Sequence, residues 1–167
     1  MSRRIEFTAN YSLPAEVVHR TLTAPAFWND RVAKGADSGV TLTRLESGPG
    51  TIDVAVNQVV DTSALPSIVT KLIKGDLAIL RSENWSPVAG GSAAGSFAVD
   101  TTGIPVTVRG TYTLTDVDGG STLTGAGEVD VNVKLIGGTI EGMVVDQVRK
   151  IFETDQEAVE EWAAANA

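Results

Sequence analysis

The sequence predicts an α+β domain in which a curved antiparallel sheet of six to seven strands wraps around one long C-terminal helix. Two observations lead to this fold class. Apolar and polar residues alternate in a series of segments joined by short links, which is typical of antiparallel strands. From residue 136 to residue 162 the apolar period changes to that of an α-helix. No repeat or linker divides the chain, so residues 1–167 are expected to form a single domain.

The N-terminal part is expected to contain one strand and two short helices. Residues 4–11 alternate and place four apolar side chains on one face, namely Ile5, Phe7, Ala9 and Tyr11. Pro14 lies in the first turn of a short helix, and Pro25 opens a second one that carries Phe27 and Trp28. These helices therefore follow the first strand directly.

The middle of the chain is expected to form an antiparallel meander. Glycine-containing turns separate alternating segments, which are residues 40–46, 51–60, 77–86, 93–100, 104–115 and 121–133. Residues 61–75 interrupt this series, and the stretch from Pro66 to Ile73 is expected to form about two helical turns that end at Gly75. Because the other links are short, consecutive strands should pair with each other.

The last element is expected to be an amphipathic helix over residues 138–164. At 3.6 residues per turn, one broad stripe collects Ile136, Ile140, Met143, Val144, Val148, Ile151, Ala158 and Trp162. Opposite charges four residues apart, such as Asp146 with Lys150, lie on the other side. A helix of this kind lies across an apolar surface, which the sheet supplies.

Composition excludes several classes of partner and site. The formal net charge is −8 and Lys and Arg are not clustered, so neither nucleic acid nor an anionic membrane surface is an expected partner. The chain has no cysteine and one histidine, so we expect no metal site and no cofactor. No apolar run approaches the ~20 residues of a membrane span, and Arg3-Arg4 precedes a strand pattern, not an export signal. A cytoplasmic protein is the expectation.

Several segments resemble a known superfamily: Ile5-Glu-Phe-Thr-Ala-Asn-Tyr11, Pro25-Ala-Phe-Trp28, Asp61-Thr-Ser-Ala-Leu-Pro66, Gly103-Ile-Pro-Val106 and Leu135-Ile-Gly-Gly138. Together with the element order, they resemble the START-like (SRPBCC) superfamily and its helix-grip fold, which includes the birch-pollen-allergen type and polyketide-cyclase-like proteins. Within it the chain is similar to an uncharacterised actinobacterial family. The resemblance implies a binding or carrier protein for a hydrophobic small molecule (lipid, sterol or polyketide-like) held between sheet and helix.

The strands carry many small residues, and their role stays open at the level of sequence. A curved sheet does not lie flat on a straight helix, so a cavity remains unless large side chains fill it. Gly95, Gly110, Gly125 and Gly127 either relieve crowding where the sheet bends or leave room for a ligand. Both roles are compatible with one structure.

Six residues are the candidates for ligand binding. Gln58, Arg81 and Gln147 are polar residues on otherwise apolar faces, and a few polar groups in an apolar pocket are typical of a ligand site. The large apolar side chains of Trp28, Trp85 and Met143 are candidates for its wall. Each also has a purely structural interpretation. In that interpretation, the three polar side chains pair with each other or with backbone groups, and the three large apolar side chains are part of the hydrophobic core.

Two other functions compete with that of a carrier. An enzyme of the polyketide-cyclase or dehydratase type would act through Arg81, Glu83 or His19, although no acid–base pair stands out and no catalytic residue is assigned. The plain interpretations are a surface histidine for His19 and a self-neutralising pair near the cavity rim for Arg81 and Glu83. A protein-interaction domain would instead use an exposed edge strand or helix.

Overall fold

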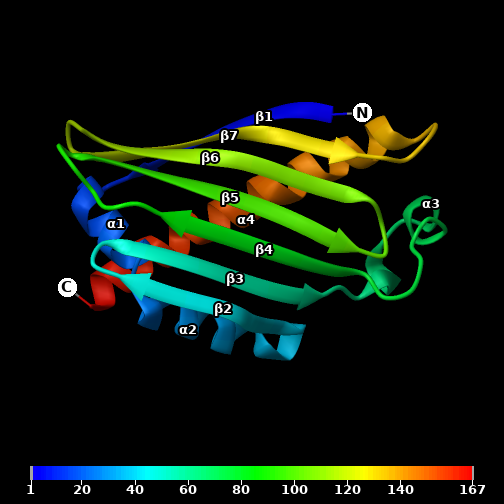
Figure 1. Cartoon of the computed structure of the whole chain (residues 1–167), viewed down its shortest axis with the longest axis horizontal. Helices are drawn as coiled ribbons and strands as arrows, with labels where there is room; N and C mark the ends of the chain where they lie inside the picture. Colours follow the sequence, from blue (N-terminus) through cyan, green and yellow to red (C-terminus); the bar gives the residue numbers. More distant parts are fainter. Residues whose placement is uncertain (1, 167) are drawn as a thin grey trace.

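A seven-stranded antiparallel sheet curves around a long helix, in the order β1-β7-β6-β5-β4-β3-β2 (Figure 1). The computed structural model describes residues 2–166. The strands are β1 (Ser2–Tyr11), β2 (Val40–Gly48), β3 (Thr51–Val59), β4 (Ala78–Trp85), β5 (Ser92–Thr102), β6 (Val106–Val117) and β7 (Gly120–Val131). The predicted fold class is confirmed, because the strands joined by short links do pair as a meander.

The helices lie on one face of the sheet, behind it in the view of Figure 1. They are α1 (Ala15–Leu22), α2 (Pro25–Gly35), α3 (Ser67–Thr70) and α4 (Gly137–Ala165), with 3-10 turns at Ala36–Ser38 and Thr62–Ala64. The segment expected to make two helical turns therefore makes one. Of the helices in residues 2–166, none combines the length and the apolar character that a membrane crossing requires.

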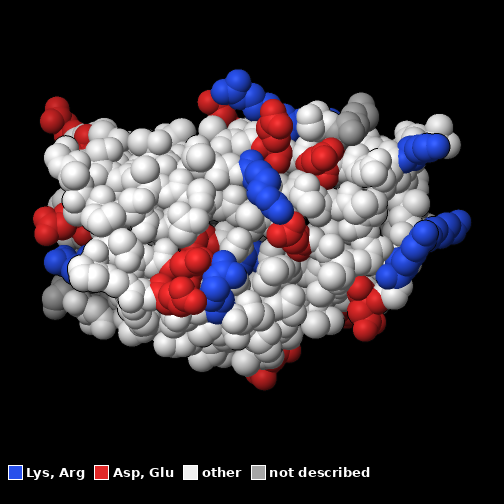
Figure 2. Space-filling model, in the orientation of Figure 1, with Lys and Arg blue, Asp and Glu red and all other residues white. Residues whose placement is uncertain are grey.

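Helix α4 crosses the sheet and packs mainly on β1 and β7, whereas α2 packs on β2 and β3 at the opposite edge. Helix α1 joins these two regions by packing on α4 and on the ends of β5, β6 and β7. The space under the sheet is thus covered by α4 on one side and by α2 on the other (Figure 1). The outer face of the sheet, shown in Figure 2, is mostly uncharged, and several of its charged groups lie beside groups of opposite charge.

Aromatic rings occupy the space that the inward-facing glycines leave. Phe7 pairs with Gly125, and Phe97 with Gly110, across neighbouring strands. A Cβ atom at either glycine would overlap the ring of its partner. The glycines therefore let rings lie flat on the sheet. The centre of the sheet–helix space is filled by these rings, Tyr112 and Phe152, with Phe7 and Phe152 centroids 4.1 Å apart.

Candidate functional site

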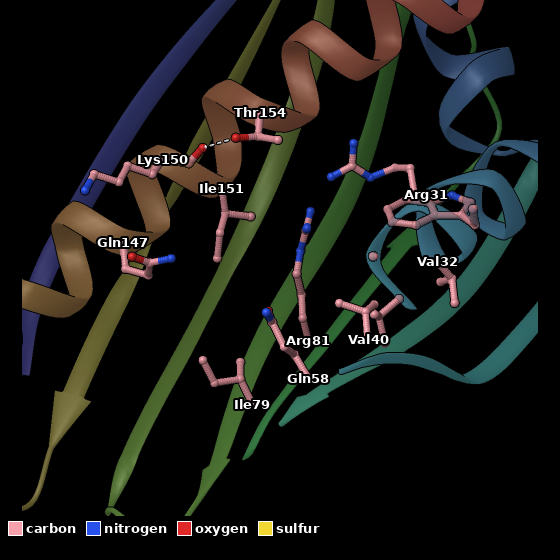
Figure 3. A pocket seen from close by; sticks show the side chains of 13 residues that line it. Arg31, Val32, Val40, Gln58, Ile79, Arg81, Gln147, Lys150, Ile151 and Thr154 are labelled. Atoms are coloured by element: carbon pink, nitrogen blue, oxygen red, sulfur yellow. Dashed lines mark hydrogen bonds between the residues drawn. The ribbon is translucent and has the colours of Figure 1, made fainter. Parts of the chain in front are cut away.

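A pocket of about 290 Å³ lies where α2, the β2–β4 half of the sheet and α4 meet (Figure 3). Its apolar wall comes from all three layers and consists of Trp28, Val32, Val40, Val56, Ile79 and Ile151. Arg31, Gln58, Arg81 and Gln147 supply polar atoms. The pocket exists because the inward positions of β2 to β4 beneath α2 carry aliphatic or polar side chains, whereas the far end of β4 carries Trp85 and the neighbouring strands carry rings.

Four of the six candidate residues line this pocket, namely Trp28, Gln58, Arg81 and Gln147. The Trp28 indole is buried and donates its Nε1 hydrogen to the carbonyl oxygen of Leu22 at 2.7 Å. Gln58 and Gln147 are exposed at the mouth, and neither amide forms a hydrogen bond with another residue in the range 2–166. These two amides therefore have donors and acceptors free for a ligand or for water.

The remaining two candidates lie outside the pocket lining. Trp85 is 2% exposed at the far end of β4, and its ring stacks on Tyr112 with centroids 5.3 Å apart. Met143 is half-buried one turn before Gln147 on α4 and packs against the core. Both positions are those of core side chains.

A buried carboxylate at the inner end of the pocket binds two arginines. Asp155 of α4 lies 2.7 Å from Arg31 Nη2, measured to its Oδ1 atom, and it accepts hydrogen bonds from Nη1 and Nη2 of Arg81. This Arg31–Asp155–Arg81 cluster connects α2, α4 and β4. Removing one partner of such a pair leaves a buried charge uncompensated, which typically costs ~3–5 kcal/mol. The cluster fixes the geometry of the pocket's inner end.

A second acid, Glu83, lies beyond Arg81 on the same face of β4. The side chain is 4% exposed and hydrogen-bonds with Tyr112, while its Oε2 atom has no partner among residues 2–166. Burial raises the pKa of Glu83 to about 7, against the opposing effect of Arg81. Burial also raises the pKa of Tyr112, and the Glu83 carboxylate adds to that shift. Glu83 can therefore gain or lose a proton near neutral pH.

Sequence comparison places the chain in a family. The model of a family described as "Protein of unknown function (DUF2505)" matches residues 6–163. The chain belongs to this family. Relatives include Uncharacterized protein Rv0481c of Mycobacterium tuberculosis and Uncharacterized protein Mb0491c of Mycobacterium bovis, each 32% identical over 173 residues that cover 99% of both chains. Their mycobacterial origin agrees with the actinobacterial resemblance.

Similar structures confirm the helix-grip fold of this DUF2505 member. The structure of Ara h 8.0201 gives a TM-score of 0.60 at 12% identity and covers 99% of each chain. TTHA0849 from Thermus thermophilus gives 0.58 at 13% identity, with 100% of this chain and 99% of that chain covered. Norcoclaurine synthase from Thalictrum flavum gives 0.55 at 10% identity, covering 98% and 87%. At these identities the likeness shows the fold alone.

The expectations for His19 and for the Arg81–Glu83 pair were wrong. His19 is 3% exposed, and its Nε2 atom lies 2.7 Å from the carbonyl oxygen of Ser86, because α1 covers the end of the sheet. Glu83 is buried and Arg81 is half-buried, and Arg81 bonds with Asp155 instead of forming a closed pair with Glu83 at the rim. A carboxylate from another element is therefore the main partner of Arg81.

The sequence analysis did not identify Arg31 and Asp155 as site residues, but the sequence does contain an indication for Asp155. At 3.6 residues per turn, it lies between Val144 and Val148, inside the apolar stripe and near one of its edges. An acid there must be paired when the helix is buried. Arg31 lies on a short helix of weak periodicity and gives no comparable signal. Within residues 2–166, no three His, Asp or Glu side chains are grouped to hold a metal ion.

Proposed function

We propose that this DUF2505 protein binds or carries a small, largely apolar molecule in the pocket between α2, β2–β4 and α4. The observation that supports this most directly is an apolar pocket whose mouth holds two amides, Gln58 and Gln147, without partners in the described range 2–166. Ligand pockets are typically apolar with a few convergent polar groups. The helix-grip fold places this pocket on the concave side of the sheet, next to the long helix.

The size of the pocket limits the ligand. At about 290 Å³ it is slightly smaller than the ~300–1,000 Å³ that is usual for small-molecule sites. A short-chain lipid or a compact polyketide-like ring fits this volume better than a complete sterol. The aromatic rings under β5 to β7 prevent the pocket from extending along the sheet.

The test is native mass spectrometry of the protein purified from its own host, with a matched pair of variants. Ile79→Trp fills the pocket, whereas Leu80→Trp places the same ring on the outer face of the same strand. We expect a co-purifying compound in the wild type and in Leu80→Trp, and its loss in Ile79→Trp. Equal retention in both variants, or no bound compound in any of the three, would overturn the proposal.

An enzyme of the polyketide-cyclase or dehydratase type is the second candidate. It is favoured by Glu83, whose Oε2 atom has no partner within residues 2–166 and whose pKa lies near neutrality beside Tyr112. Arg81 lies between Glu83 and the pocket and stays protonated, so Glu83 would exchange a proton with a ligand only if the Arg81 side chain moved aside. Incubating the purified protein with its co-purified compound separates the two candidates, because a carrier returns that compound unchanged in mass and connectivity.

A further inference from the structure

Two arginines and one carboxylate meet at the inner end of the pocket, although the whole protein is acidic. Two guanidinium groups, those of Arg31 and Arg81, share the single carboxylate of Asp155. Figure 3 shows these two side chains converging from α2 and β4. The net charge of the protein is −8, so this local excess of positive charge is not a general property of its surface.

Arg31 retains hydrogen-bond donors that no other described residue uses. A guanidinium carries five N–H groups in a planar fork that suits carboxylates and related acids. Arg31 contacts Asp155 through Nη2, and its Nε and Nη1 atoms have no acceptor within residues 2–166. Its side chain is 22% exposed, so a ligand can reach these donors from the pocket.

We propose that the pocket takes an amphiphile with a single negative charge, whose acid group binds Arg31 beside Arg81. The apolar body then lies along Val40, Val56 and Ile79 and points toward the mouth, where the Gln58 and Gln147 amides are free. This inference rests on the proposed function and specifies the chemical class of its ligand.

The protonation state of Glu83 determines the net charge at the inner end of the pocket. When Glu83 is protonated, Arg31, Arg81 and Asp155 sum to +1, which one ligand anion neutralises; when Glu83 is ionised, the sum is zero. The groups that interact with Glu83 are Arg81 on its own strand, Tyr112 on β6, Asp155 on α4, Arg31 on α2 and Tyr11 on β1. Burial raises the pKa of Glu83 to about 7. The anion should therefore bind more tightly, by roughly tenfold, at pH 5.5 than at pH 8.5.

Two probes that differ in charge test this inference. Sodium octanesulfonate stays ionised across this pH range, and 1-octanol has the same chain without a charge. Each is titrated into the ¹⁵N-labelled full chain while the amide resonances of the pocket residues are followed by NMR. We expect the sulfonate to bind about tenfold or more tightly than the alcohol at pH 6.

Substitutions of Arg31 test whether the preference for the sulfonate over the alcohol arises in the pocket. Arg31→Gln should remove the preference for the sulfonate, and Arg31→Lys should keep most of it. Arg109→Gln is the matched control, because Arg109 pairs with Asp100 on the outer face and should leave both affinities unchanged. Thermal melts verify that each variant is folded. Glu83→Gln should retain sulfonate binding and lose its pH dependence.

The outcomes separate the inference from the proposed function. If both probes bind with equal affinity and Arg31→Gln changes neither, the pocket binds apolar molecules and the anionic class is wrong. If neither probe shifts pocket resonances and no compound co-purifies, the proposed function fails as well. A pH dependence that persists in Glu83→Gln would overturn the role given to that acid.

Discussion

The two halves of the concave face of the sheet are built differently. Under β1 and β5 to β7, the rings of Phe7, Phe97, Tyr112 and Phe152 pack against each other and leave little space. Under β2 to β4, the same surface carries aliphatic and polar side chains beneath α2 and encloses a pocket. Curvature alone thus does not make a cavity. Whether the space is filled depends on which inward positions carry rings.

Charged groups are also distributed differently between the two halves. The ring-filled half is mainly apolar, although it buries Tyr11, Ser121 and Glu141 as well as Tyr112, whereas the pocket half contains the Arg31–Asp155–Arg81 cluster. Buried ions need partners and are a poor source of net stability. We therefore expect the ring-filled half to contribute most of the free energy of unfolding that comes from packing. The pocket half should contribute less, because it keeps space and polar groups for a ligand. The predictions below test this contrast, from the largest expected effect to the smallest.

Truncation of adjacent residues on α4 should distinguish the two halves most strongly. Phe152→Ala removes a buried ring that contacts Phe7 and should lower the free energy of unfolding by ~3–5 kcal/mol. Ile151→Ala removes a half-buried side chain from the pocket wall and should cost only ~1–2 kcal/mol, because solvent already reaches that site. Urea unfolding measures both. Equal costs would mean that the pocket half is packed as tightly as the other.

The pH dependence of stability should report on Glu83. Burial raises its pKa from 4.5 to about 7, so between these values the folded protein binds more protons at this group than the unfolded chain does. The free energy of unfolding should therefore fall as the pH rises through this window, by up to ~3 kcal/mol, and level off above it.

Glu83→Gln should remove this contribution, whereas Glu128→Gln, on the exposed side of β7, should retain it. Urea unfolding at intervals from pH 5 to pH 8.5 gives the comparison. A wild-type profile that is flat, or one that rises over this interval, would contradict the assigned shift.

The order of elements could be predicted because it depends on local periodicity, but the rotation of α4 could not. The predicted stripe runs from Met143 at one edge to Val148 at the other, whereas the structure buries a line through Phe152, Asp155 and Val159 that lies at and beyond the Val148 edge. Met143, near the edge of the stripe, stays half-buried. The contact between Phe152 and Phe7, distant in sequence, fixes this rotation.

The sequence also could not predict which helix or side chain each inward residue of a strand contacts. Alternation correctly places Arg81, Glu83 and Trp85 on the inner face of β4. Alternation predicts on which face of the sheet a side chain lies, but it does not predict which side chains of the helices pack against it. Arg81 lies under α4 beside Asp155, whereas Trp85 lies near α1 beside His19 and Tyr112. Only the packed helices determine which inward side chains line the pocket.

Gln147→Leu should have the smallest effect on stability and a selective effect on binding. The side chain is exposed at the mouth of the pocket and forms no hydrogen bond within residues 2–166, so replacement by a side chain of similar volume orphans no partner. The free energy of unfolding should change by less than ~0.5 kcal/mol, as is usual for a surface position. Affinity for octanesulfonate should be unchanged or slightly higher, because Leu extends the apolar wall. Affinity for 8-hydroxyoctanesulfonate, whose hydroxyl would meet this amide at the mouth, should fall relative to octanesulfonate. Thermal melts and paired NMR titrations measure these effects. A loss of ~1–3 kcal/mol in stability with both affinities unchanged would show that Gln147 is a structural anchor and has no part in the pocket.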